Sequence, residues 1–438
     1  MNKNLGKQLW HRALKTIPGG NGLLSKRPER YLSGNWPTYY SYCKGVNVID
    51  LDGKKFIDMA QMGVGSAILG YANDELVAEV NKASESGVNC TLNSPEEVYL
   101  SELLIDLNPF SGGVKYARSG AEAMSIAIRL ARAYTKSDKV AFSGYHGWSD
   151  WYLATNIKGK NNLKNHLLPG LDPLGVPRAL LNTTFPFEYN NSEDFLKVIE
   201  TNPDIKIICI EGARFDYPKK DFLNTIMQVA KKYNMIIVSD EITSGWRVTD
   251  GGVYKINGFK PDIVVYGKGM GGGYAISAVV GKKEIMQMAN ESFVSSTMWT
   301  ERIGFVAALK TIDIICREQL WKHLDLLGTI IGEGWKKSAK DNGLLISINE
   351  FKPLISFKFN YGNDNDLILT IFMQEMLKRG YLASSSIYLS LAHTEEIVAC
   401  YLKHVDNVFA LIAEAIRKKQ LSNILKTDIR SDAFKRLT

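Results

Sequence analysis

The chain has 438 residues, a formal net charge of +7, and 45% hydrophobic and 23% charged residues. This length and composition predict a globular protein with a large buried core and more than one domain. The positive charge is spread along the chain, apart from the short run 417–419, which argues against a nucleic-acid-binding surface. No apolar run is long enough for a membrane span, and the amphipathic start lacks the apolar stretch of a signal peptide.

The five cysteines lie far apart and include no CxxC pair. A disulfide framework and a metal centre are therefore not expected, and the spacing fits a reducing, cytoplasmic compartment.

The N-terminal part of the chain mixes several element types. Residues 4–17 predict an amphipathic helix that ends at a Pro-Gly-Gly sequence. Residues 21–45 are rich in Pro, Gly, Tyr and Trp and predict an extended loop. The alternating residues 46–60, with Asp52-Gly53 inside them, predict a hairpin. Helical spacing follows over residues 73–86 and 95–107.

From about residue 113, short apolar runs alternate with stretches of helical spacing. Strands are predicted at 114–117, 139–144, 205–212, 235–240 and 262–266, and helices at 119–135 and 221–234. A long loop is predicted between the strand at 139–144 and about residue 190. This alternation favours a mostly parallel sheet covered by helices. Residues 302–340 are predicted to be mostly helical, and the remainder mixes short strands with helices at about 365–379 and 394–418.

These patterns predict a division into two domains. We expect an N-terminal segment of residues 1–65 that joins the small domain, a large domain of residues 66–315, and a C-terminal small domain of residues 316–438.

Two of the predicted strands end in residues that suit chemistry. The run from Met235 ends in Asp240 and Glu241, and the run from Ile263 ends in Lys268. In open α/β sheets, ligands bind beyond the carboxyl ends of the strands. A lysine among apolar groups can lose its proton and form a Schiff base with an aldehyde cofactor, while an aspartate can hold a pyridine nitrogen protonated. Taken alone, both residues fit solvated loop positions or an ion pair at least as well.

Two turns between strands and helices add to this pattern. Ser119 is a good N-cap followed by Gly120, so the helix start at 118–123 could bind a phosphate. Tyr145, between glycines at a strand end, could stack on a flat ring. The alternatives are a plain capped helix and an aromatic side chain that packs on the sheet. The glycines follow Lys268 rather than precede it, which is the wrong order for a P-loop.

The order of these features resembles the class III aminotransferases, which are pyridoxal-phosphate enzymes of fold type I. Within that family, the motifs are most similar to those of glutamate-1-semialdehyde 2,1-aminomutase. The resemblance extends over nearly the whole chain. It rests on TIPGG at 16–20, DLDGKKFID at 50–58, LGYA at 69–72, RSGAEAMSIAIRLARAYT at 118–135, GYHGWSDW at 144–151, SDEITSGWR at 239–247, YGKGMGGG at 266–273 and LAHTEE at 391–396.

The resemblance implies an α/β fold with a mostly parallel seven-stranded sheet in the large domain, a smaller α+β domain, and a homodimer with sites at the interface. It implies that Lys268 forms a Schiff base with pyridoxal 5'-phosphate and that Asp240 pairs with the pyridine nitrogen. Ile242 and Tyr145 would cover the two faces of the ring. The other implied cofactor contacts are Ser119, Gly120, Ala121, His146 and Glu211. Thr297 would reach the phosphate of the neighbouring subunit, and Thr300 is its rival for that role.

Three departures from the family concern the cofactor turn and the substrate. Ala121 replaces the usual threonine, Gly212 replaces a proline, and residues 24–28 replace the Ser-Pro-Val-Arg of the aminomutases. The candidate substrate contacts are Arg214, Lys26 and Arg27. The alternative is that these residues are solvated surface cations.

We therefore predict an aminotransferase that moves an amino group from a small-molecule donor to an aldehyde or ketone of a polar, sugar-like acceptor. Two alternatives stay open. One is glutamate-1-semialdehyde 2,1-aminomutase activity, and the other is a cofactor-binding protein without turnover.

Overall fold

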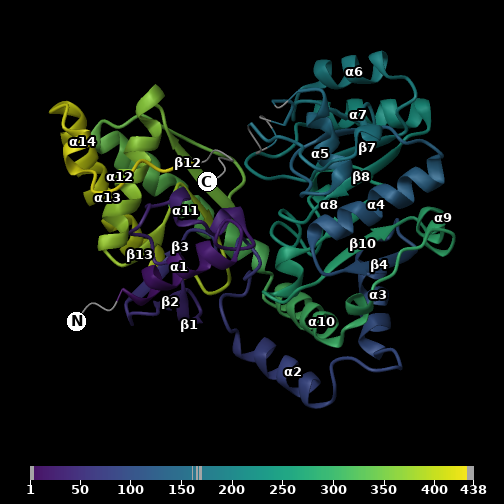
Figure 1. Cartoon of the computed structure of the whole chain (residues 1–438), viewed down its shortest axis with the longest axis horizontal. Helices are drawn as coiled ribbons and strands as arrows, with labels where there is room; N and C mark the ends of the chain where they lie inside the picture. The colour runs from purple at the N-terminus through teal and green to yellow at the C-terminus, as the bar shows by residue number, and fades with distance from the viewer. Residues whose placement is uncertain (1–3, 160, 164–165, 167–169, 432–438) are drawn as a thin grey trace. The chain divides into compact units, whose positions relative to one another are not determined.

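The chain folds into two compact units. The computed structural model describes residues 4–159, 161–163, 166 and 170–431. One unit combines Met1–Asn73 with Lys322–Thr438, and the other consists of Asp74–Trp321 (Figure 1). No helix among the described residues is long and apolar enough to cross a membrane.

The larger unit is built on a seven-stranded sheet with the order β4-β10-β9-β8-β7-β5-β6. Strand β10 runs antiparallel to both of its neighbours, and the other four pairs are parallel. The predicted mostly parallel sheet is confirmed. The strands are β4 (Gly113–Ala117), β5 (Val140–Ser143), β6 (Thr184–Pro186), β7 (Ile207–Glu211), β8 (Ile236–Asp240), β9 (Ile263–Tyr266) and β10 (Ser277–Gly281).

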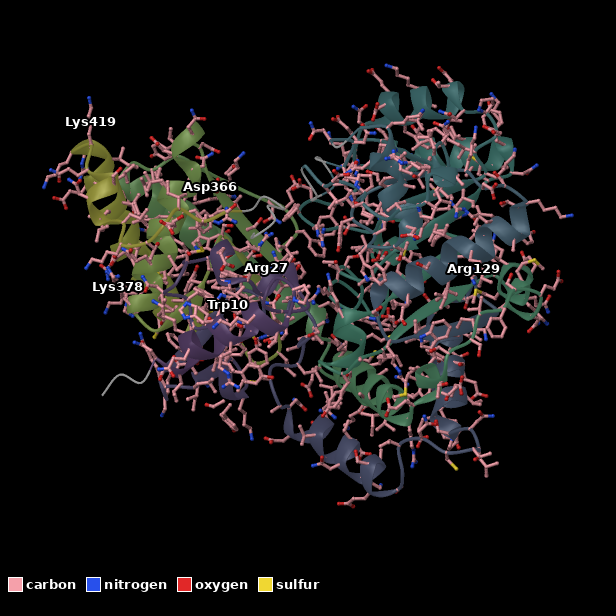
Figure 2. The ribbon with its side chains drawn as sticks, in the orientation of Figure 1. Trp10, Arg27, Arg129, Asp366, Lys378 and Lys419 are labelled. Carbon is pink, nitrogen blue, oxygen red and sulfur yellow. The ribbon has the colours of Figure 1, made fainter. Side chains whose placement is uncertain are left out.

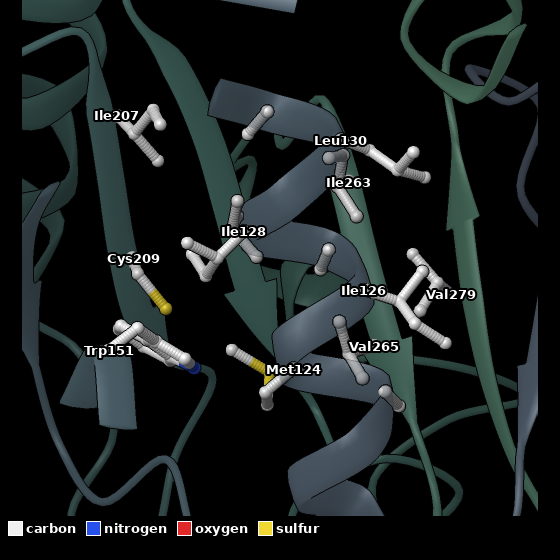
Figure 3. Packing of buried hydrophobic residues seen from close by; sticks show 14 of the residues in the cluster. Met124, Ile126, Ile128, Leu130, Trp151, Ile207, Cys209, Ile263, Val265 and Val279 are labelled. Atoms are coloured by element: carbon white, nitrogen blue, oxygen red, sulfur yellow. The ribbon is translucent and has the colours of Figure 1, made fainter. Parts of the chain in front are cut away.

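Helices pack on this sheet because its central strands are apolar on both faces. Every residue of β7, β8 and β9 is buried. Figure 3 shows α4 lying over the strands, with Met124 and Ile128 among side chains of the sheet such as Cys209 and Val265. The helices of this unit are α2 (Asp74–Glu85), α3 (Pro95–Leu107), α4 (Gly120–Thr135), α5 (Asp150–Leu153), α6 (Ser192–Thr201), α7 (Lys220–Tyr233), α8 (Tyr254–Asn257), α9 (Lys283–Met286) and α10 (Arg302–Arg317).

The smaller unit has two sheets, with the orders β1-β2-β3-β13 and β11-β12-β14. Strand β13 pairs with β3 in parallel, so the first and last parts of the chain share one sheet. The strands are β1 (Tyr40–Lys44), β2 (Asn47–Asp50), β3 (Lys55–Met59), β11 (Ile346–Ile348), β12 (Leu354–Phe359), β13 (Tyr381–Ala383) and β14 (Ser386–Tyr388). The helices are α1 (Leu5–Thr16), α11 (Leu320–Asn342), which begins at the boundary between the units, α12 (Asn365–Lys378), α13 (Glu395–Arg417) and α14 (Leu421–Ile424).

Two local predictions were wrong. Residues 21–45 contain short 3-10 turns at Leu24–Lys26 and Pro28–Arg30 and the strand β1, rather than only an extended loop. Most residues of β1 are exposed, so the strand has no apolar alternation by which to recognise it. The stretch before residue 190, also expected to be a loop, contains the three-residue strand β6 at the edge of the large sheet.

Candidate active site

The carboxyl ends of the parallel strands bring the predicted residues of the larger unit together. Asp240 closes β8, Glu211 closes β7, and these two residues are paired across the strands. Lys268 follows β9, which is the neighbour of β8 on its other side. The edge of the sheet therefore carries a carboxylate and an amine on adjacent strands, as the positions of the two apolar runs predicted.

Asp240 is buried, with 4% of its surface exposed, and both of its oxygens are engaged. Oδ1 accepts a hydrogen bond of 3.0 Å from the backbone N–H of Ile242, and Oδ2 lies 2.8 Å from Nδ1 of His146. The second ring nitrogen of His146 lies 3.2 Å from the carbonyl oxygen of Ser143, which can only accept. Both imidazole nitrogens therefore face acceptors, as in a doubly protonated ring.

The charge on His146 follows from its surroundings. Burial alone lowers the pKa of His146, but the nearby Cys209 sulfur and the hydrogen bond to Asp240 outweigh it and raise the pKa well above its ordinary value. Burial raises the pKa of the Cys209 thiol and keeps it neutral, so the hydrogen bond to Asp240 is what raises the pKa of His146. A doubly protonated His146 would donate one N–H to Asp240 and the other to the carbonyl oxygen of Ser143.

Lys268 has an unusual backbone and a defined side-chain partner. Its φ is +42°, in the left-handed region that residues with a side chain rarely adopt. Its Nζ donates a hydrogen bond of 2.8 Å to Oγ1 of Thr243, and the lysine is half-buried. Backbone strain of this kind persists where the surrounding structure imposes it, which is common at functional sites.

The phosphate turn, which we define as residues 119–121 before α4, is where the sequence leads us to expect an anion site. Ser119 and Glu122 form a reciprocal capping box, with the Ser119 N–H donating to the Glu122 carboxylate over 2.8 Å. Among the described residues, the N–H groups of Gly120 and Ala121 have no hydrogen-bond partner. These two donors and the positive helix end can bind a phosphate.

Glycines at two positions let the parts of the site approach each other. A Cβ at Gly120 would lie 2.8 Å from Cδ1 of Ile242. A Cβ at Gly147, whose φ is +97°, would lie 2.8 Å from Cβ of Ala121. The phosphate turn therefore touches both Ile242 and the turn that follows β5.

Tyr145 is held by a buried ion pair. Its backbone N–H donates to Oε2 of Glu211 over 3.0 Å, and Oε1 of the same carboxylate lies 3.6 Å from the Arg214 guanidinium. The guanidinium carbon lies 5.6 Å from the centre of the Tyr145 ring. Only 13% of the Arg214 side chain is exposed, so it is not the solvated surface cation that the sequence left open. Burial raises the pKa of the Tyr145 hydroxyl, so it stays protonated.

A cavity of about 500 Å³ adjoins this ion pair. Its wall combines aromatic and polar side chains. The lining residues are Ser143, Gly144, Tyr145, His166, Glu188, Tyr189, Asn190, Glu211, Arg214, Phe215, Asp216 and Lys219.

Thr297 and Thr300 lie in one exposed 3-10 turn, which residues beside the phosphate turn hold in place. The Arg118 guanidinium donates hydrogen bonds of 2.5 Å to the carbonyl oxygens of Met298 and Glu301. The Trp299 indole N–H donates to Glu122 over 3.3 Å. The role of Arg118 as the anchor of this turn was not predicted, although Arg118 begins the RSGAEA motif.

Lys26 and Arg27 belong to the smaller unit. Lys26 is exposed, and Arg27, which is labelled in Figure 2, is half-buried beside Gly19. The packing of the Arg27 guanidinium against the Gly19 backbone gives it a local structural contact.

Glu241 is a buried carboxyl to which the sequence pattern assigned no role of its own. It accepts hydrogen bonds from the hydroxyls of Ser244, at 2.5 Å, and Ser239, at 3.3 Å. Burial raises the pKa of Glu241 from 4.5 to about 7, and the Ser244 hydrogen bond only partly opposes this. The only signal for it in the sequence is its place next to Asp240 at a strand end.

This pKa shift predicts a pH dependence of stability. The pKa of Glu241 is higher in the folded state than in the unfolded state. Its contribution to the free energy of unfolding is therefore full below about pH 4.5 and is lost as the pH rises through 7. The shift corresponds to about 3 kcal/mol. Glu241→Gln removes this dependence. In urea unfolding of both proteins, the unfolding free energy of the variant relative to that of wild type should be higher at pH 8 than at pH 5. An equal pH dependence of the two unfolding free energies would contradict the expected ionisation of Glu241.

Comparison with known proteins identifies the family. Residues 32–383 match the family described as aminotransferase class-III. The chain belongs to this family. The chain is 31% identical over 421 residues to the 3-aminobutyryl-CoA aminotransferase of Cloacimonas acidaminovorans, with 94% of this chain and 95% of that protein covered. It is 29% identical to the glutamate-1-semialdehyde 2,1-aminomutase of Thermodesulfovibrio yellowstonii, with coverage of 90% and 96%.

Solved structures agree with the fold. The internal aldimine form of the FumI protein of Sphingopyxis sp. MTA144 matches with a TM-score of 0.86 and 22% identity, covering 98% of the aminotransferase and 99% of that chain. An omega-transaminase from Sphaerobacter thermophilus matches with a TM-score of 0.82 and 21% identity, covering 94% and 98%. The predicted fold type I is confirmed.

The chain is a pyridoxal 5'-phosphate-dependent enzyme, as its family is. Its own residues fit this cofactor. They supply an amine at Lys268, a buried carboxyl group at Asp240 and, among the described residues, two unpartnered backbone donors at Gly120 and Ala121.

Proposed function

We propose that this aminotransferase moves an amino group from a small donor to an aldehyde or ketone of a polar, hydroxylated acceptor, with Lys268 and Asp240 at the centre of the chemistry. The observation that supports this proposal most strongly is that Lys268 and the Asp240–His146 pair lie at the ends of adjacent strands, at one edge of the sheet.

The roles of the residues follow from what each can do. When bound, pyridoxal phosphate supplies an aldehyde for an amine and a ring that accepts electrons. Lys268 would anchor it and, once released, take a proton from the donor carbon that bears the amino group. Asp240, which His146 holds in place through a hydrogen bond, would hold a proton on the ring nitrogen. Ile242 and Tyr145 would cover the two ring faces.

The remaining groups would hold and orient the cofactor. The backbone N–H groups of Gly120 and Ala121, with the Ser119 cap, would bind the phosphate. Glu211 would act by fixing the turn that carries Tyr145, because it accepts the Tyr145 N–H.

The cavity beside Tyr145 supports a hydroxylated acceptor. Its volume of about 500 Å³ falls in the range of small-molecule sites. Tyr189 and Phe215 add apolar ring surface, while Glu211 and Arg214 offer an acceptor and a donor side by side. Hydroxyl groups can both donate and accept, so they can use both members of this ion pair.

We also propose a homodimer in the cytoplasm. Thr297 is exposed, and the neighbouring apolar side chains of Phe293 and Met298 are 88% and 54% exposed. Burial of these side chains against a second copy would be favourable and would bring Thr297 to the partner's phosphate site. The free cysteines fit a reducing compartment.

A second candidate function is glutamate-1-semialdehyde 2,1-aminomutase activity, which the 29% identity to such an enzyme favours. The replaced residues 24–28 weigh against it. Complementation of a bacterial strain that lacks 5-aminolevulinate synthesis separates the two, because only the aminomutase predicts rescue.

The acceptor class is tested with the enzyme in its pyridoxamine-phosphate form. Glyceraldehyde and dihydroxyacetone represent hydroxylated carbonyl compounds, and pyruvate and succinate semialdehyde represent carboxylated ones. We expect a higher kcat/KM with the hydroxylated probes and a loss of about 10- to 100-fold in Arg214→Met with these probes alone, as for a lost charged hydrogen bond. A preference for the carboxylated probes that Arg214→Met abolishes would contradict the proposed acceptor.

A further inference from the structure

The hydroxyl of Thr243 contacts the reactive amine of the site. Its Oγ1 accepts the hydrogen bond of 2.8 Å from Nζ of Lys268, and the threonine is 5% exposed. Because the threonine end is buried, bulk water competes little for its hydroxyl oxygen. The contact therefore restricts where the amine group can point.

Thr243 sits on a turn that the surrounding backbone makes rigid. Its carbonyl oxygen accepts a hydrogen bond of 2.8 Å from Nε of the buried Arg247. The N–H of Glu241 donates to the carbonyl of Val265 over 2.9 Å, and the N–H of Gly245 donates to the carbonyl of Glu241 over 2.8 Å. The turn is thus tied to strand β9, which leads to Lys268.

The same turn carries two other groups of the site. Asp240 begins it and accepts the N–H of Ile242, whose side chain touches the phosphate turn at Gly120. Asp240, Ile242 and Thr243 therefore lie on one hydrogen-bonded turn. The position of the Lys268 amine is set by the same element that sets the ring-facing carboxylate.

We propose that Thr243 is a positioning residue for Lys268, which orients the amine lone pair for proton transfer to and from the substrate carbon. This inference rests on the proposed function. In the transfer, the Lys268 nitrogen takes a proton from the donor carbon and becomes an ammonium, and the electron pair of the broken C–H bond stays on the substrate side. Thr243 stays neutral and accepts an N–H of Lys268 before and after the transfer.

Two substitutions separate the hydroxyl from the shape of the side chain. Thr243→Val keeps the volume and loses the acceptor, and Thr243→Ser keeps the acceptor. We expect Thr243→Val to slow the single-turnover reaction with the amino donor by about 10- to 100-fold, as a misplaced catalytic group does, with KM for the donor within about 2-fold of wild type. Thr243→Ser should restore the rate to within about 3-fold, which is less than one ordinary hydrogen bond contributes.

Two further readouts do not depend on the rate itself. A donor deuterated at the reacting carbon should give a larger kinetic isotope effect in Thr243→Val, because proton transfer then limits the reaction. The visible absorption band of the holoenzyme should change in position or intensity in Thr243→Val and match wild type in Thr243→Ser. Thr249→Val, which removes a hydroxyl that bonds to Asp250, is the matched control and should behave as wild type.

Two results would overturn the inference. One is a Thr243→Val protein, with an unchanged melting temperature, that keeps the wild-type rate, isotope effect and spectrum. The other is a loss of rate that Thr243→Ser does not restore. Thr243→Ala provides the same comparison if the valine variant does not fold. A wild-type enzyme that gains no absorption band with the cofactor would instead overturn the proposed function, and this inference with it.

Discussion

Lys268→Ala is expected to lower transamination by at least about 10⁴-fold, the upper end of what one general acid or base supplies. The variant loses both the amine that would anchor the cofactor and the base that would move the proton. Because Lys268 is half-buried in a strained turn, a solvent molecule cannot replace its positioned amine. The rate of the first half-reaction with the donor, followed by absorbance, measures this loss.

Added methylamine should recover a small part of the lost activity, since a free amine can act as the base without being positioned. Lys260→Ala, which removes an exposed lysine in the loop before β9, is the control. Lys268→Ala protein that turns over at more than a tenth of the wild-type rate would show that another residue moves the proton.

Asp240→Asn is expected to lower kcat by about 10²- to 10³-fold, as the loss of one preorganised electrostatic contact at a developing charge does. The amide keeps the shape of the side chain but loses its negative charge. The ring nitrogen would then lose the anion that holds its proton, so the ring would accept electrons less well. The effect is large because the carboxylate is buried, where charges interact more strongly than in water.

The same substitution removes the partner that raises the pKa of His146. A buried imidazole without a carboxylate favours the neutral form, so the pKa of His146 should fall. A histidine NMR titration of wild type and Asp240→Asn measures this fall. Asp204→Asn, at an exposed ion pair with Lys139, is the control. Wild-type kcat together with an unchanged His146 titration in Asp240→Asn would contradict the role of the pair.

The fold followed from the sequence where hydrophobic patterning was strong. The strands β7, β8 and β9 are continuous apolar runs, and α4 begins at a capping box, so each carried its own local signal. The edge strands β1 and β6 have no such pattern in the sequence, because β1 is mostly exposed and β6 has only three residues.

Only part of the candidate site could be predicted from the sequence, because local patterns do not reveal contacts between distant residues. The carboxyl ends of neighbouring parallel strands lie at one edge, which predicted that Asp240 and Lys268 come together. The partners of these residues depend on side-chain contacts between distant positions. Thr243 is 25 residues from Lys268, and Arg118 is 180 residues from Met298. Such pairs leave no periodic signal in a single sequence.

The most direct test of the account is to find the residue that binds the cofactor. The holoenzyme is treated with borohydride, which fixes the link between cofactor and protein, and is then digested and mapped by mass spectrometry. The account predicts one pyridoxyl group per chain, on Lys268. A pyridoxyl group on another lysine, or on none, would contradict the central role of Lys268.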